Sequence, residues 1–258
     1  MNKSFSQFVC LSGMPRSGST LLSAILSQNP LIHAEGNSAV CQLMWDMQIS
    51  CLTKANEQLR ANNRENTAHH LISQIPHIYY KDISEDIVVD KCRSWTLKPN
   101  IDLLQNYIDK NIKIIVLVRS VIDIVRSFVK LYKANNVYTD ELASNLVVTN
   151  SEPIMRSLEG IKWAKKNNEN NTFLFINYDD FVKNTQENID RIYDFCGWEP
   201  FKHDFNNIYL KYPENDAVYN LPGQHEIRST IQKVNNNKIR LEESLYKKCI
   251  IIDKLYNL

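Results

Sequence analysis

Short apolar runs alternate with longer segments of helical periodicity along most of the chain. The short runs predict buried β-strands at Phe8–Ser12, Ile87–Asp90, Lys113–Val118 and Thr172–Asn177. Apolar residues at helical spacing predict helices at Thr20–Gln28, Val121–Ala134, Pro153–Lys166, Gln186–Cys196 and Asn235–Tyr256. Strands that alternate with helices in this way are typical of a parallel sheet covered on both faces.

One segment interrupts this alternation. Residues from about 38 to 78 have helical spacing in two or three pieces, before the run at 87–90, which we expect to be the second strand. We therefore expect one α/β domain over residues 1–258, with a helical insertion at about 38–78. Ligands of parallel sheets bind beyond the carboxyl ends of the strands, so the residues that follow each strand are the first candidates for a site.

The first predicted strand leads directly into a phosphate-binding pattern. Residues 13–20, GMPRSGST, contain two of the six glycines and have the spacing of a P-loop, Gly-x-x-x-x-Gly-Lys-Ser/Thr. Backbone N–H groups and the N-terminus of the next helix suit a phosphate. Ser19 stands at the lysine position, so the cation that reaches the β and γ phosphates of a triphosphate is missing. Arg16 supplies an earlier cation, which favours a 5′-phosphate with a shorter tail.

A second candidate anion site follows the strand at 113–118. Arg119 stands at the end of that strand, and Ser127 lies eight residues later on the next predicted helix. The two side chains could converge on one phosphate. The alternative is an ordinary ion pair of Arg119 beside a helix that Ser120 caps.

Together, these segments resemble the sulfotransferases that use 3′-phosphoadenosine 5′-phosphosulfate (PAPS). Residues 15–21, PRSGSTL, resemble the 5′-phosphosulfate loop of that family, and Arg119 with Ser127 matches its Arg-x7-Ser pair for the 3′-phosphate. The PRSG sequence is most similar to the tyrosylprotein and carbohydrate branch. Weaker matches follow the first helix (Asn29-Pro30) and lie at 96–98 and 175–181.

The resemblance implies a P-loop-type three-layer sandwich, a central parallel sheet flanked by helices, that binds PAPS as cosubstrate without a metal. It implies donor-binding roles for Arg16, Ser17, Gly18, Ser19, Thr20, Arg119, Ser127, Tyr178 and Arg228. Of these, Tyr178 would lie near the adenine, and Arg228 belongs to a late basic loop that could reach the 3′-phosphate.

The catalytic residues implied are Arg16, Lys91 near the bridging oxygen, and Glu35 as general base, with His33 as the second candidate. The stretch Asp90–Trp95 has no histidine, unlike the cytosolic small-molecule branch, and the segment 33–38 is irregular compared with the tyrosylprotein enzymes. The expected reaction moves a sulfuryl group from PAPS to a hydroxyl of a carbohydrate, small molecule or peptide.

Two other functions fit parts of the sequence. Asp90 at the end of a strand could hold Mg²⁺ in a P-loop kinase or NTPase, although Ser19 argues against that reaction. The irregular segment at 33–38 also allows a non-catalytic nucleotide-binding module.

Charge and composition limit the partners. The chain has 30 basic and 29 acidic residues, a net charge of +1, so nothing drives it towards nucleic acid or an anionic membrane. The longest continuous apolar run, Ile114–Val118, cannot cross a bilayer, and no signal peptide is recognisable. The six cysteines are scattered and predict thiols rather than disulfides. We therefore expect a cytoplasmic protein, and the resemblance implies that its partner is a hydroxyl-bearing acceptor.

Overall fold

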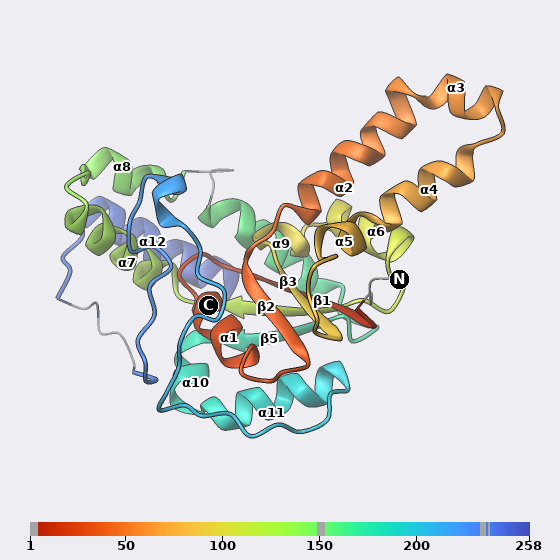
Figure 1. Cartoon of the computed structure of the whole chain (residues 1–258). Coiled ribbons are helices and arrows are strands. Elements are labelled where there is room, and N and C mark those ends of the chain that lie inside the picture. The colour runs from red at the N-terminus through yellow and green to blue at the C-terminus, as the bar shows by residue number, and fades with distance from the viewer. Residues whose placement is uncertain (1–4, 149–152, 233–235, 237) are drawn as a thin grey trace.

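A five-stranded parallel sheet forms the centre of the protein (Figure 1). The computed structural model describes residues 5–148, 153–232, 236 and 238–258. In the order β2-β3-β1-β4-β5, the strands are β2 (Ile32–Asn37), β3 (Ile87–Lys91), β1 (Gln7–Gly13), β4 (Lys113–Val118) and β5 (Phe173–Asn177). After β1 the chain forms the edge strand β2, returns to β3 beside β1 and then crosses to β4 and β5 on the other side, so the strand order changes sides at β1 and the carboxyl end of β1 is the expected ligand position.

Helices cover both faces of the sheet, because the side chains of each strand alternate between the two faces. Val9 and Leu11 face one apolar core, whereas Cys10 between them faces the other. The first core packs against α1 (Ser19–Leu26), α10 (Tyr178–Lys183) and α11 (Thr185–Cys196). The second packs against α6 (Lys98–Tyr107), α7 (Val121–Ala134), α9 (Ile154–Lys166) and α12 (Glu243–Tyr256). The predicted fold class is therefore confirmed.

The segment between β2 and β3 is helical and projects away from the sheet (Figure 1). It consists of α2 (Val40–Ile49), the π-helical turn η1 (Ser50–Lys54), α3 (Asn56–Ala61), α4 (Glu65–Ser73) and α5 (Ile75–Tyr79). Three shorter helices lie elsewhere: the 3-10 helices η2 (Arg93–Thr96) and η3 (Asp216–Tyr219), and α8 (Asp140–Asn145).

Two predictions about the elements were wrong. Residues 32–37 form the edge strand β2, so the strand at 87–91 is the third strand and not the second. This edge strand pairs only with β3, with a register shift between Ala34 and Asn37, and its sequence IHAEGN lacks a continuous apolar run. The last helix begins at Glu243 and not at Asn235, because the Glu242 carboxylate caps it by accepting from the N–H groups of Ser244 and Leu245. Residues 233–235 and 237 lie outside the described residues.

Candidate active site

The loop after β1 has a backbone that two glycines make possible. Gly13 has a φ of +132°, and the N–H of Met14 donates to the carbonyl of Leu117 on β4 at 2.9 Å. A Cβ at Gly13 would lie 2.2 Å from that carbonyl oxygen, so only glycine fits there. Gly18 has a φ of +90° and precedes the first turn of α1. The sequence therefore folds into the tight strand–loop–helix turn that the P-loop pattern predicts.

The start of α1 is open to an anion. No side chain caps its first turn, so its N–H groups and the helix dipole point to the space above the loop. Ser19 and Thr20 line this space. Ser17 is buried, and its hydroxyl donates to the carbonyl of Met14 at 2.6 Å, so its side chain stabilises the turn.

Arg16 and Arg119 meet beside Ser127. Nε of Arg16 donates to the Ser127 hydroxyl at 3.1 Å, and a terminal nitrogen of Arg119 donates to the Arg16 carbonyl at 2.7 Å. The Arg119 guanidinium also stacks on the ring of Tyr178, 4.1 Å from its centroid. Burial, and then the charge of Arg119, lower the pKa of Arg16. Nε of Arg119 is buried without a hydrogen-bond partner in the described part of the chain. The second anion site therefore contains two arginines and one hydroxyl.

One cavity of about 630 Å³ connects the two anion sites. The phosphate loop, Arg119, Ser127 and Tyr178 line one part of it, and Lys91 with Arg93 lines another. Arg228 also lines the cavity, and its guanidinium donates to the Gln232 side chain at 2.9 Å. The structure thus brings together every predicted donor-binding side chain except that of Ser17.

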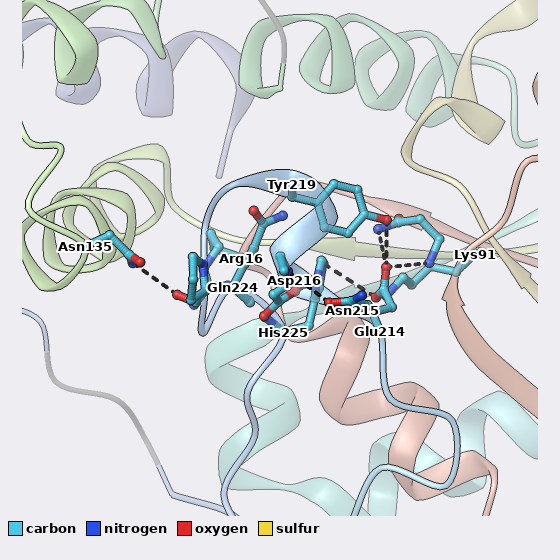
Figure 2. Close-up of polar contacts among 12 residues, drawn as sticks. Arg16, Lys91, Asn135, Glu214, Asn215, Asp216, Tyr219, Gln224 and His225 are labelled. Carbon is cyan, nitrogen blue, oxygen red and sulfur yellow. Dashed lines mark hydrogen bonds and ion pairs between the residues drawn. The ribbon is translucent and has the colours of Figure 1, made fainter.

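Residues 214–232, which we call the covering loop, contribute much of the cavity lining between Pro222 and Gln232, and Figure 2 shows part of this loop between Arg16 and Lys91. Arg16 donates to the carbonyl of Gln224, and the side-chain amide of Asn135, which caps the end of α7, donates to the carbonyl of Pro222 at 3.0 Å. The covering loop is therefore attached both to the phosphate loop and to the helix that carries Ser127.

The covering loop also brings two carboxylates and a histidine to Lys91 (Figure 2). Lys91 is buried, and its Nζ lies 3.1 Å from Glu214. Nε2 of His225 lies 3.5 Å from Glu214, and Nδ1 lies 2.6 Å from Asp216. Tyr219 donates to Glu214 at 3.2 Å. His225 lines the cavity, so a histidine oriented by a carboxylate faces the space beside Lys91.

The pKa values of this cluster follow from burial and charge pairing. Burial lowers the pKa of Lys91, although Glu214 opposes that change. Burial acts to raise the pKa of Glu214, but the charges of Lys91 and His225 outweigh it and lower the pKa overall. The pKa of Asp216 is likewise lowered, because hydrogen bonds from His225 outweigh burial. Both carboxylates are therefore ionised at neutral pH.

Glu35 and His33 lie apart from this cavity. Both are on β2, with Nε2 of His33 3.1 Å from the Glu35 carboxylate, and His33 packs against the rings of Tyr80 and Tyr212. Glu35 lines a small neighbouring cavity, which shares Thr20, Lys91 and His225 with the larger one, and Glu35 does not line the larger one. The strand thus places the predicted base in the small cavity beside Lys91 and Thr20 and not in the lining of the larger cavity.

Glu214, Asp216 and His225 were not predicted as site residues from the sequence. They come from a segment without regular periodicity, and only the fold shows that it crosses the phosphate loop. The one available signal was the His-Glu-Ile-Arg sequence at 225–228, which follows a proline and a glycine in the loop before the last helix.

Asp90, the candidate Mg²⁺ ligand of the kinase alternative, is fully buried. Its carboxylate accepts hydrogen bonds from Tyr80 at 2.8 Å and from the indole of Trp95 at 2.6 Å. Burial raises its pKa, and Asp90 does not line the larger cavity. Within the described ranges, no group of three His, Cys, Asp or Glu side chains could hold a metal ion. These contacts give Asp90 a role in packing α5 and η2 against β3.

Comparison with known proteins identifies the family. The sequence profile described as "Sulfotransferase family" matches residues 9–203. The chain belongs to the sulfotransferase family. A search of curated proteins finds no match to the sequence. Of the residues that the structure describes, no helix is both long and apolar enough to cross a membrane.

Solved sulfotransferase structures share the fold. The sulfotransferase domain of the Synechococcus PCC 7002 olefin synthase is similar with a TM-score of 0.62 and 17% identity, over 99% of this chain and 96% of that one. The sulfotransferase domain from the curacin biosynthetic pathway has a TM-score of 0.59 and 19% identity, over 100% and 99%. Mouse sulfotransferase SULT7A1, complexed with PAP, has a TM-score of 0.50 and 15% identity, over 97% and 83%.

Proposed function

We propose that this sulfotransferase transfers the sulfuryl group of PAPS to the hydroxyl of an acceptor. The observation that carries the proposal is a single cavity with two anion sites, the phosphate loop and the Arg16–Arg119–Ser127 site. A donor with phosphate groups at both its 5′ and 3′ positions requires such a pair. The missing P-loop lysine agrees with a donor that has no γ phosphate.

The residues present fit that donor. The 5′-phosphosulfate would lie on the N–H groups of the loop and on the open end of α1, near Ser19 and Thr20. The 3′-phosphate would lie beside Arg119 and Ser127, where the unpartnered Nε of Arg119 offers a buried donor. The mouse structure with PAP supports this choice of ligand, because it shares the fold.

In the reaction, an S–O bond forms to the acceptor oxygen while the S–O bond to the 5′-phosphate breaks. The leaving phosphate oxygen gains negative charge, which the ammonium group of Lys91 stabilises. The acceptor hydroxyl loses its proton to Nε2 of His225, while Asp216 holds Nδ1 and so orients the ring. We assign the base to His225 rather than to Glu35, because His225 lines the cavity and Glu35 does not.

We propose a small hydroxyl compound as acceptor rather than a protein tyrosine. The olefin synthase and the curacin pathway, whose sulfotransferase domains share the fold, act in the biosynthesis of small molecules, which supports this choice. The similarity of the loop to the tyrosylprotein and carbohydrate branch stays a prediction from the PRSG sequence. The cytoplasmic location also stays a prediction.

The test compares 3′,5′-adenosine bisphosphate (PAP) with ATP. We expect PAP without metal to raise the melting temperature, and we expect radiolabelled PAPS to transfer its label to a compound in an acceptor panel. A shift with ATP and Mg²⁺ but none with PAP would instead support the kinase alternative. PAP binding without transfer to any acceptor would support the non-catalytic module.

A further inference from the structure

Arg93 lies at a different part of the cavity from the 3′-phosphate site. It follows β3, whereas Arg119 follows β4, and these strands flank β1 on opposite sides. Arg93 and Lys91 line the cavity together. Because Lys91 and His225 mark the reacting end of the donor in the proposed function, Arg93 lies on the acceptor side of that point.

The backbone that carries Arg93 is held firmly. The hydroxyl of Ser12 on β1 donates to the Arg93 carbonyl at 2.9 Å. Arg93 is the first residue of η2, where Asn100 donates to the Ser94 carbonyl at 2.6 Å and the fully buried Trp95 donates to Asp90. The backbone of Arg93 is therefore fixed, and its exposed side chain extends from this position into the lining of the cavity.

The carboxylates near Arg93 are already paired with other groups. Glu214 is bound by Lys91, and Asp216 by His225. The Arg93 guanidinium has no ion pair and no hydrogen bond with the part of the chain that the structure describes. Burial is the largest cause that lowers the pKa of Lys91, and the positive charge of Arg93 lowers that pKa further. Two positive charges therefore face this end of the cavity, and only one of them has a counterion.

We propose that Arg93 binds an anionic group of the acceptor, so that the acceptor is a hydroxyl compound with its own carboxylate or phosphate. This inference rests on the proposed function and names its substrate class. The donor groups already have partners in the loop, Arg16, Arg119 and Lys91. Of the other cations that line the cavity, Lys130 lies on α7 and Arg228 in the covering loop, whereas Arg93 lies two residues after Lys91. A guanidinium binds carboxylate or phosphate through two parallel hydrogen bonds, so the acceptor is held with its hydroxyl in a fixed direction.

The experiment uses the full chain saturated with PAP, which occupies the donor site. Calorimetry measures the binding of two matched pairs: 3-hydroxybutyrate against its methyl ester, and glycerol 3-phosphate against glycerol. We expect at least one anion to bind about tenfold or more tightly than its neutral partner. The first pair reports a carboxylate and the second a phosphate, so the two pairs distinguish the two groups.

Variants assign the effect to Arg93. Arg93→Gln should weaken binding of the anion by about 10- to 100-fold and leave PAP affinity unchanged. Arg93→Lys should restore little of the lost affinity for the anion, because an ammonium group cannot form the two parallel hydrogen bonds. Arg60→Gln removes the same charge from an exposed position on α3 and should behave like the wild type.

Several results would overturn the inference: equal affinity for anion and neutral partner, no binding of either anion, or an unchanged affinity in Arg93→Gln. A parallel loss of PAP affinity in Arg93→Gln would also overturn it, since Arg93 would then belong to the donor site. If the wild type binds PAP but neither anion, only this inference fails. If the wild type does not bind PAP, the proposed function fails with it.

Discussion

Replacing His225 with asparagine tests the proposed base most sharply. The side-chain amide of asparagine can still donate to Asp216, in place of Nδ1 at 2.6 Å, so the covering loop keeps this attachment. What is lost is Nε2, the atom that we propose as the base, which lies 3.5 Å from the Glu214 carboxylate in the structure. General-base catalysis contributes about 10²- to 10⁴-fold, so kcat should fall by that factor, or roughly 3–5 kcal/mol of transition-state stabilisation.

The assay is transfer of radiolabel from PAPS to the best acceptor of the panel, with kcat and KM measured separately. The KM for PAPS should change less than threefold, because His225 contacts neither phosphate site in the structure. Glu35→Gln is the matched control, and we expect its kcat to stay within about threefold of the wild type. The assignment would be refuted if His225→Asn kept its kcat while Glu35→Gln lost a hundredfold.

Three further predictions concern the donor site and stability. Arg119→Met should weaken PAP binding about 10- to 100-fold in calorimetry, because it removes a charge-assisted contact to phosphate, and unchanged affinity would contradict the assigned 3′-phosphate site. Gly13→Ala should lower the free energy of unfolding, measured by urea titration, by roughly 3 kcal/mol, because the alanine Cβ would lie 2.2 Å from the Leu117 carbonyl oxygen. An unchanged free energy of unfolding would refute the loop geometry. Burial acts to raise the pKa of Glu85, but hydrogen bonds, first from Lys211, outweigh it and lower the pKa from 4.5 to about 2. Glu85→Gln should therefore lower the free energy of unfolding by about 2 kcal/mol at pH 7. The difference in unfolding free energy from the wild type should shrink as the pH falls from about 4.5 towards 2. A difference that does not change with pH would contradict the ion pair.

The sequence predicted the central elements well, because their signals are local. The strand at 113–118 and the helix at 121–134 agree with the structure at both ends, since each combines an unbroken apolar pattern with polar flanks. The phosphate loop was recognisable because its glycines and its place between a strand and a helix are properties of adjacent residues.

The missed features depend on contacts between distant segments. β2 is an edge strand whose pairing with β3 compensates for its polar sequence, so no local pattern reveals it. Its presence moves Glu35 away from the larger cavity. Glu214 and Asp216 meet Lys91 and His225 only because the covering loop returns over the sheet edge, more than a hundred residues after Lys91. Spacing along the chain carries no information about such contacts.

The account depends most on one donor that spans both anion sites. A crystal structure of the protein with PAP tests this directly. We predict the 5′-phosphate on the N–H groups of the phosphate loop at the start of α1, and the 3′-phosphate within hydrogen-bond distance of Arg119 and Ser127. Density for PAP elsewhere, or a 3′-phosphate that contacts neither side chain, would contradict the account.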